Sequence, residues 1–395
     1  MGFLSKIRGS IARVFRSVTS GASSVMRTLK KSSSPLSDRL LSDALRIAEI
    51  PSPSSREEQR GVFIVERLTA LGLSPKVDEN GNIIVRITRK EHDDNGPILL
   101  FTDLASARWN PLESLSRLDP DRAYGAGLAD AIGPASLLSM AESILSGKIA
   151  CDQDLLLLFA AHSLDHPGSD ILERLADDPH NRPNAALGVR GLHLGTVSAR
   201  PLGTYRIEVR VRTDSSDGRQ GQGSAVEAIV ELSRTLSGIT WDAEKTTTCR
   251  IRRIEAGTGF GRNPTEGLLD IELESTNGAV LELAMKAAIA TAQAKKLENQ
   301  ITVTIAGYVP VGVPAVGDVL VKLLTQALKE QRIPIIEENG ADTASFLSVH
   351  GIPAASVPIA SGREGLSQDE IEIASIEKGR NLLIRLIELV AAAIK

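Results

Sequence analysis

Two hydrophobic patterns alternate along residues 37–199. Short runs, 98–101 and 154–161, are continuously apolar, which is typical of strands that are covered on both faces. Elsewhere apolar residues recur every three or four positions, which predicts amphipathic helices. The predicted helices are 37–49, 57–71 and 133–147, and Asn80-Gly81 predicts a hairpin that joins 73–79 to 82–88. Strands that alternate with helices indicate an α/β domain.

The pattern changes near residue 203. The segment TYRIEVRVRT alternates strictly between polar and apolar residues, which predicts a strand with one buried face and one solvated face. Up to residue 308 the predicted order is strand, helix, strand, strand, helix, strand, over 204–213, 224–237, 246–255, 267–275, 278–295 and 300–306. This order is the split ferredoxin-like arrangement of an α+β domain.

The first pattern then resumes. Helices are predicted over 316–330, 342–350 and 375–394, and strands over 333–337 and 353–359. We therefore predict a mixed-sheet α/β domain in two parts, 37–199 and 309–395. The α+β domain at 200–308 is inserted between them, and residues 1–36 form a separate N-terminal segment and linker.

This N-terminal segment is strongly basic. It contains no acidic residue, and its basic residues are Lys6, Arg8, Arg13, Arg16, Arg27, Lys30 and Lys31. Apolar residues recur at helical spacing from Leu4 to Leu29, which predicts a basic amphipathic helix. Such a helix, over residues 1–31, suits an anionic membrane surface or a partner protein. An organelle-targeting peptide has the same composition, and a tail docked on its own domain is a third interpretation.

The composition excludes several classes of protein. The chain has 395 residues, and seven of its 45 basic residues lie in the N-terminal segment, which leaves 38 basic against 49 acidic residues. The remaining chain is therefore acidic, and nucleic acid is not an expected partner. No run of about 18 apolar residues predicts a membrane span. Two cysteines, Cys151 and Cys249, are too few for a disulfide framework. We expect a cytoplasmic protein, with peripheral membrane contact and organelle targeting left open.

Five segments form an ordered set of motifs. They are "LRIAEIPSPSSREEQRGVFIVERLTALGL", "YGAGLADAIGPAS", "GTGFGRNPTEGLLDIELES", "ENGADTASFLSVHGIPAASVPIA" and "LSQDEIEIASIEKG". In this order they resemble the M20 metallopeptidase and aminoacylase family, closest to its peptidase T-like branch. The resemblance covers about residues 38–393. It implies a two-domain α/β hydrolase with an inserted ferredoxin-like lid, which often pairs two copies of the chain.

The resemblance also implies a site with two zinc ions. The family's bridging aspartate matches Asp130, and its substrate-contacting lid asparagine matches Asn263, which is otherwise a turn residue before a proline. At the other ligand and base positions this chain has Thr102, Leu104, Ser163, Leu164, Gly188 and Leu366. Threonine, leucine and glycine do not ligate zinc as imidazole or carboxylate does. We therefore expect no metal cofactor.

A reduced metal site is the alternative. His162, Asp165 and His166 cluster after the run 154–161. With Asp103 and Asp130 they could hold one zinc ion, with Asp165 as the catalytic residue. The other interpretation of this cluster is a polar surface turn. Asp130 is correspondingly either a relic metal ligand or a loop cap that binds backbone amides.

Three functional hypotheses follow from the sequence. The first is an M20 peptidase-like protein that has lost catalysis and acts by binding a peptide, an acyl-amino acid or a protein partner. The second is an active metal-dependent peptidase or amidase with an atypical zinc site. The third is a structural homodimer that pairs through the lid domain.

Overall fold

The computed structural model describes most of the chain outside the N-terminal segment. The described residues are 35–53, 56–89, 96–106, 115–161, 169–213, 224–242, 246–257, 259–260, 264–294 and 300–394. The predicted basic helix at residues 1–31 lies outside them, so it stays a prediction.

The body is built on a six-stranded mixed sheet with the order β1-β2-β6-β3-β7-β13. Its strands are β1 (Lys76–Val77), β2 (Ile83–Ile87), β3 (Ile98–Asp103), β6 (Leu155–Ala160), β7 (Ala185–Arg190) and β13 (Ala354–Pro358). The last four strands in this order run parallel, whereas β1 and β2 form the predicted antiparallel hairpin. All of β6 is buried, as its continuous apolar run predicts.

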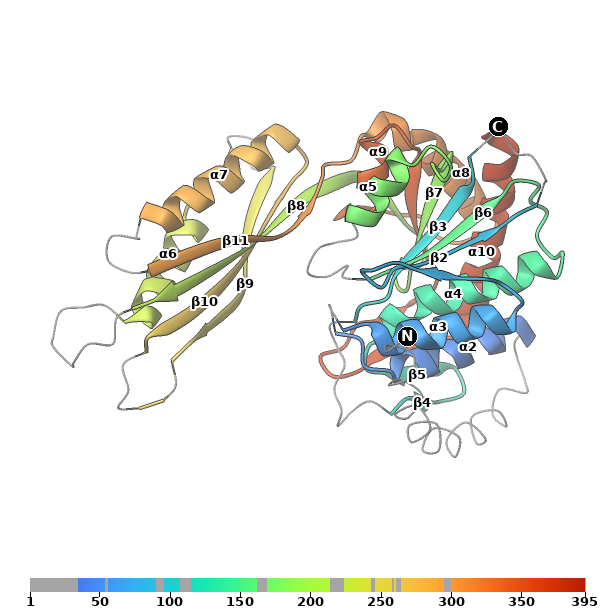
Figure 1. The fold of residues 1–395 in the computed structure, drawn as a ribbon, viewed down its shortest axis with the longest axis horizontal. Coiled ribbons are helices and arrows are strands. Elements are labelled where there is room, and N and C mark those ends of the chain that lie inside the picture. Colours follow the sequence, from blue (N-terminus) through green and yellow to red (C-terminus); the bar gives the residue numbers. More distant parts are fainter. Residues whose placement is uncertain are drawn as a thin grey trace.

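Helices cover both faces of this sheet, and Figure 1 shows α4 and α5 on opposite sides. One face packs on α2 (Pro35–Ala48), α3 (Glu58–Ala70), α4 (Leu128–Leu145), α8 (Pro314–Glu330) and α10 (Ile373–Ala393). The other face packs on α5 (Ser169–Asp177) and the single turn α9 (Ser345–Ser348). Side chains alternate between these faces along each strand, so Leu100 belongs to the first core and Phe101 to the second.

Helix α4 begins at Leu128, five residues before the predicted start at 133. Pro134, which the prediction placed in the first turn, lies inside the helix instead. By length and hydropathy α4 is the one helix among the described residues that could cross a membrane, but 83% of it is buried in the body. Packing of this largely apolar helix in the core therefore outweighs the unfavourable proline.

The inserted domain has the predicted split ferredoxin-like order. Its elements are β8 (Thr196–Arg212), α6 (Ala225–Ser237), β9 (Thr247–Ala256), β10 (Glu266–Ser275), α7 (Gly278–Ala294) and β11 (Gln300–Val309). The sheet order is β11-β8-β10-β9. Ile207, Val209 and Val211 point to the buried face that α6 and α7 cover, as the strict alternation predicts. The two-domain α/β architecture with an inserted lid is confirmed.

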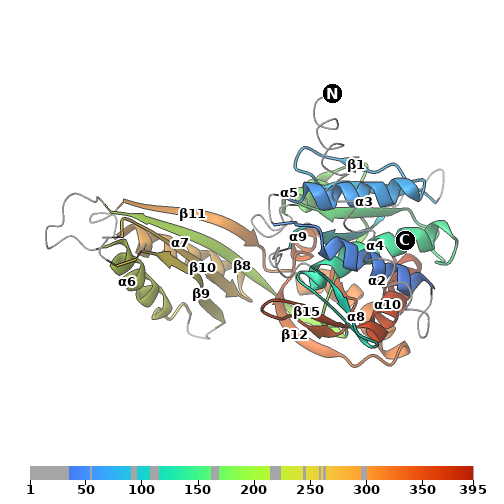
Figure 2. The same cartoon turned by 90° about the horizontal axis from the view of Figure 1, so that it is seen from below.

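Two strands carry the chain between body and lid. β8 and β11 both span the connection, which Figure 2 shows from below. At this hinge the rings of Tyr205 and Tyr308 stack with centroids 4.5 Å apart. The ring of Phe346, in α9 of the body, meets Tyr308 edge-on at 6.3 Å. Aromatic contacts therefore link the root of the lid to the body.

Some elements differ from the prediction. A four-stranded sheet of β14 (Gly362–Arg363), β15 (Asp369–Glu372), β5 (Arg122–Gly125) and β4 (Arg117–Leu118) was not predicted, because strands this short show no periodicity. β12 (Ile336–Ala341) begins three residues later than predicted. Ile333 instead closes α8, since its N–H donates to the Leu328 carbonyl at 2.9 Å. The predicted helix 342–350 is reduced to α9 and flanking turns.

Candidate functional site

The carboxyl ends of β3 and β7 lie side by side at the centre of the body sheet. The two strands are paired in register from Ile98 opposite Ala185 to Phe101 opposite Gly188. Each strand has five buried residues followed by one exposed residue, which is Asp103 in β3 and Arg190 in β7. Ligands of open α/β sheets bind outside the carboxyl ends of the strands. This edge is therefore the candidate site.

Asp103 and Arg190 project from the same face of the sheet. A Cβ added at Gly188 would lie 2.7 Å from Phe101 Cζ, so the Phe101 ring fills the space over that glycine. Phe101 and Gly188 thus share a face, and the residues two positions further along each strand share it as well. This is the face covered by α5 and α9, whereas α4, which carries Asp130, covers the opposite face.

Thr102 points to the α4 face and takes part in packing. Its side chain is buried, and its hydroxyl donates a hydrogen bond to the Val189 carbonyl at 3.0 Å. A Cβ at Gly133 of α4 would lie only 2.2 Å from Thr102 Oγ1, so the helix sits directly on this hydroxyl. Leu104, two residues on, is fully buried in the same core. Thr102 therefore secures α4 against β3 and β7.

Asp130 lies in the first turn of α4, which corrects its predicted placement in a loop. It is exposed, and its Oδ2 accepts a hydrogen bond from the Ser106 hydroxyl at 2.8 Å. An acidic residue in the first turn interacts favourably with the helix dipole. Asp369, which is fully buried, accepts a hydrogen bond from the Ala129 N–H at 3.1 Å. Two carboxylates thus stabilise the start of α4.

A fully buried arginine lies behind this helix start. The Arg60 guanidinium in α3 donates from Nη1 to the Leu104 carbonyl at 2.8 Å and from Nη2 to the Ile50 carbonyl at 3.3 Å. Burial lowers the pKa of Arg60 to about 10, while the negative charges of Asp130 and then Glu57 partly oppose that shift. Arg60 is therefore a buried positive charge within the electrostatic reach of Asp130.

Serine hydrogen bonds join Arg60 to Asp130 through the chain that follows β3. Ser52 Oγ donates to the same Leu104 carbonyl at 2.8 Å, and the Ser106 N–H donates to the Ser52 carbonyl at 2.7 Å. Ser106 then contacts Asp130 through its hydroxyl. Arg60 Nε has no hydrogen-bond partner within the described part of the chain. The segment after β3 is thus fixed between the guanidinium and the carboxylate.

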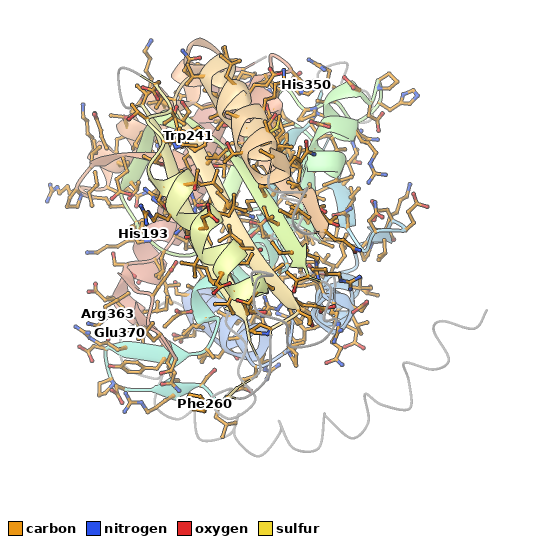
Figure 3. All side chains as sticks on the ribbon, turned by 90° about the vertical axis from the view of Figure 1, so that its left-hand side faces the viewer. His193, Trp241, Phe260, His350, Arg363 and Glu370 are labelled. Atoms are coloured by element: carbon orange, nitrogen blue, oxygen red, sulfur yellow. The ribbon has the colours of Figure 1, made fainter. Side chains whose placement is uncertain are left out.

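The remaining predicted residues fall into two groups. Leu366 is fully exposed in the hairpin between β14 and β15, beside the Arg363–Glu370 pair that Figure 3 labels. In that pair Arg363 Nη2 lies 3.1 Å from Glu370 Oε2. The other group lies outside the described residues, so their placement stays a prediction: His162, Asp165, His166, Asn263, Ser163 and Leu164.

Comparison with known proteins identifies the fold. No protein-family model matches the chain. A curated protein of Pyrococcus abyssi, described as a LysW-lysine/LysW-ornithine hydrolase, is 27% identical over 197 residues, 49% of this chain and 51% of that protein. The match thus spans about half the length of that relative. Among solved structures, aminopeptidase PepT from Bacillus cereus has a TM-score of 0.64 at 16% identity, covering 90% of this chain and 99% of that one.

Two further structures agree. The Bacillus subtilis YXEP protein, a dinuclear metal binding peptidase from the M20 family, has a TM-score of 0.59 at 14% identity, covering 91% of this chain and 99% of that one. Human carnosine dipeptidase 1 has a TM-score of 0.68 at 10% identity, and the match covers 90% of this chain and 97% of that one. The chain has the M20 peptidase fold. The resemblance predicted from the motifs is confirmed at this level.

We tested whether the described residues of this M20 fold fit a pair of zinc ions. Zinc needs about four nitrogen, sulfur or oxygen ligands. Among the residues described, no three His, Cys, Asp or Glu side chains form a group that could hold a metal ion. Thr102, at the position of the first histidine ligand, donates its hydroxyl hydrogen to the Val189 carbonyl instead. The described residues therefore do not fit the dinuclear site.

Sequence reasoning missed both arginines. Arg190 ends a buried run just as Asp103 does, but β7 was not predicted, because its alanines and glycine give a weak strand signal. At Gly191 a Cβ would lie 1.7 Å from the Ala129 carbonyl oxygen, so the chain after Arg190 passes directly against the start of α4. The burial of Arg60 could have been predicted from the sequence. Arg60, Ile64 and Leu68 lie four residues apart in the predicted helix, so Arg60 is on its buried apolar face.

Proposed function

We propose that this protein uses the M20 fold to bind a peptide or an acyl-amino acid rather than to hydrolyse it with two zinc ions. The observation that carries the proposal is that the Thr102 side chain is hydrogen-bonded and buried beneath α4. In the family resemblance this position holds the first histidine ligand. Here its short hydroxyl donates to the Val189 carbonyl and is covered by α4. A metal could not be ligated there without disrupting the packing of helix on strand.

The charge of the site supports the same proposal. A carboxylate at the bridging position needs a nearby positive charge or solvent to offset its own charge. Asp130 has both, because it is exposed and the buried Arg60 acts on it electrostatically. The serine hydroxyl of Ser106 adds a hydrogen bond. The chain thus supplies from its own residues the stabilisation that metal ions provide in a dinuclear site.

An active hydrolase is the second candidate, and the comparisons favour it. The curated relative is described as a hydrolase, and the structural neighbours include peptidases and amidases. Under this proposal a single zinc ion would use Asp165 and His166 together with Asp103 or Asp130.

One experiment separates these candidates. The full-length protein is incubated with di- and tripeptides and with N-acyl-amino acids, with and without added zinc, while hydrolysis is followed by mass spectrometry and binding by calorimetry. Binding without hydrolysis in both conditions supports the first proposal. Turnover that requires zinc and disappears in an Asp165→Asn variant supports the hydrolase.

The structural homodimer stays a third proposal. Large apolar side chains are exposed on the lid, with Leu283 of α7 66% exposed and Ile305 of β11 43% exposed. Burial of such residues between two copies would stabilise a pair. Light scattering of the protein and of a Leu283→Glu variant tests this: a dimer that becomes monomeric supports the proposal, and an unchanged mass contradicts it.

A further inference from the structure

Strand β12 forms an open edge of the body. Among the described strands it pairs with β8 alone, in parallel, with Ile336 opposite Thr196. The Ile336 N–H donates to the Gly195 carbonyl at 3.0 Å, so it faces β8. Main-chain groups of successive residues point to opposite sides of a strand, so the N–H and C=O of Glu337 face the open side. β12 therefore offers a main-chain donor and a main-chain acceptor to a further strand.

A groove runs beside this edge, between β12 and α8. It encloses about 400 Å³. It is lined by Val197, Val321, Thr325, Lys329, Ile335 and Glu337. Val197 is buried beneath it, and Ile335, just before β12, is 36% exposed. Lys329 and Glu337 carry opposite charges, so the lining has no net charge and suits an apolar side chain.

The other face of β12 carries an apolar and an acidic residue. Side chains alternate along a strand, so Ile336 and Glu338 point away from the groove that Glu337 lines. Ile336 is 47% exposed, and Glu338 is also exposed. In a strand added at this edge, every second side chain would enter the groove and those between would lie beside Glu338. A second copy of β12 is a poor occupant, because Glu337 and Glu338 of both copies would gather along one seam.

We infer that the edge of β12 binds an extended peptide segment of a partner protein in which apolar and basic residues alternate. Such a segment adds a strand to the sheet, and its main chain hydrogen-bonds to Glu337. Its apolar side chains fill the groove, and its basic side chains pair with Glu338 on the other face. This surface lies apart from the ends of β3 and β7, so the inference goes beyond the proposed function and does not depend on it.

The test uses the full-length protein and synthetic peptides with blocked ends, with calorimetry as the measurement. The probe is an octapeptide that alternates valine and lysine. We expect it to bind at least about tenfold more tightly than an octapeptide that alternates valine and glutamate, because Glu338 repels the second. N-methylation of either the valine amides or the lysine amides should abolish binding, and N-methylation of the other set should not, since only one set faces β12.

Substitutions in the protein test the two faces separately. Thr325→Arg fills the groove, and Glu338→Lys reverses the charge on the other face, so each should weaken binding at least about tenfold. Glu66→Lys makes the same charge change on the exposed side of α3 and is the matched control. Equal melting temperatures show that the variants fold.

Three results would overturn the inference. One is binding that ignores both Thr325→Arg and Glu338→Lys. Another is binding that does not distinguish the two sets of methylated amides, since main-chain pairing requires that difference. The third is a peptide that binds a chain starting at residue 35 but not the full chain, because the chain's own basic segment would then be the occupant.

Discussion

The Thr102 hydroxyl donates a hydrogen bond to the Val189 carbonyl at 3.0 Å, across the central strands β3 and β7. This contact lies where the family resemblance implies a zinc-binding histidine. The bond joins two parallel strands under α4, since Gly133 of that helix has no room for a Cβ above Thr102. A position implied as a zinc ligand thus has a packing role.

Arg60 and Asp130 should be energetically coupled. Replacing Arg60 with Met removes a buried charge and the donors to two carbonyls, so we expect unfolding free energy to fall by about 2 kcal/mol. Adding Asp130→Asn to this variant should recover part of the lost stability. The single variant leaves the Asp130 carboxylate without the Arg60 charge, and the second substitution removes that carboxylate. Urea denaturation of the wild type, the two single variants and the double variant measures the coupling. Arg46→Met is the control, and strictly additive effects would show that the two residues act independently.

The backbone at Gly191 lies so close to the start of α4 that a single added methyl group should strongly destabilise the fold. In Gly191→Ala the new Cβ would meet the Ala129 carbonyl oxygen at 1.7 Å, so β7 and α4 must move apart. We expect a loss of several kcal/mol, well beyond the ~0.5 kcal/mol of an ordinary surface change. Gly340→Ala, where no atom lies within 4 Å, is the matched control. Similar melting temperatures for both variants would contradict the close packing.

The fold was more predictable than the site, for physical reasons. The run 154–161 and the alternation at 204–213 reflect burial directly, so β6 and β8 follow from hydrophobicity alone. The start of α4 could not be predicted, because Pro134 is a helix-start signal that packing of the apolar helix overrides. The pairing of Phe101 with Gly188, which brings the carboxyl ends of β3 and β7 together, depends on strand register between distant segments. Strand register does not appear in local sequence.

The cysteines should react slowly. Burial raises the pKa of the Cys249 thiol to about 11, and burial likewise raises the pKa of Cys151. Because the thiolate is the reactive form, at pH 8 Cys249 should be alkylated about a hundredfold more slowly than a thiol of ordinary pKa near 9. The rate should rise with pH until about pH 11. Iodoacetamide labelling followed by mass spectrometry, with urea-unfolded protein as control, measures this; equal native and unfolded rates at pH 8 would contradict it.

The N-terminal segment should bind anionic vesicles. Residues 1–31 combine seven basic residues with an apolar stripe and contain no acidic residue. The full chain should sediment with phosphatidylserine-containing vesicles, and it should do so less at high salt, because each basic residue contributes about 1 kcal/mol of screened attraction. A chain that starts at residue 35 should remain in the supernatant. Equal sedimentation of the two proteins would contradict the prediction.

We predict that the full-length protein binds no zinc at this site, and elemental analysis tests this prediction directly. The protein is purified, incubated with excess zinc, dialysed and measured by plasma mass spectrometry, with its melting temperature recorded with and without a chelator. We expect well below stoichiometric zinc and a melting temperature that the chelator does not change, since Arg60 and Ser106 already stabilise Asp130. About one or two zinc ions per chain that survive dialysis, with a melting temperature lowered by the chelator, would contradict the account.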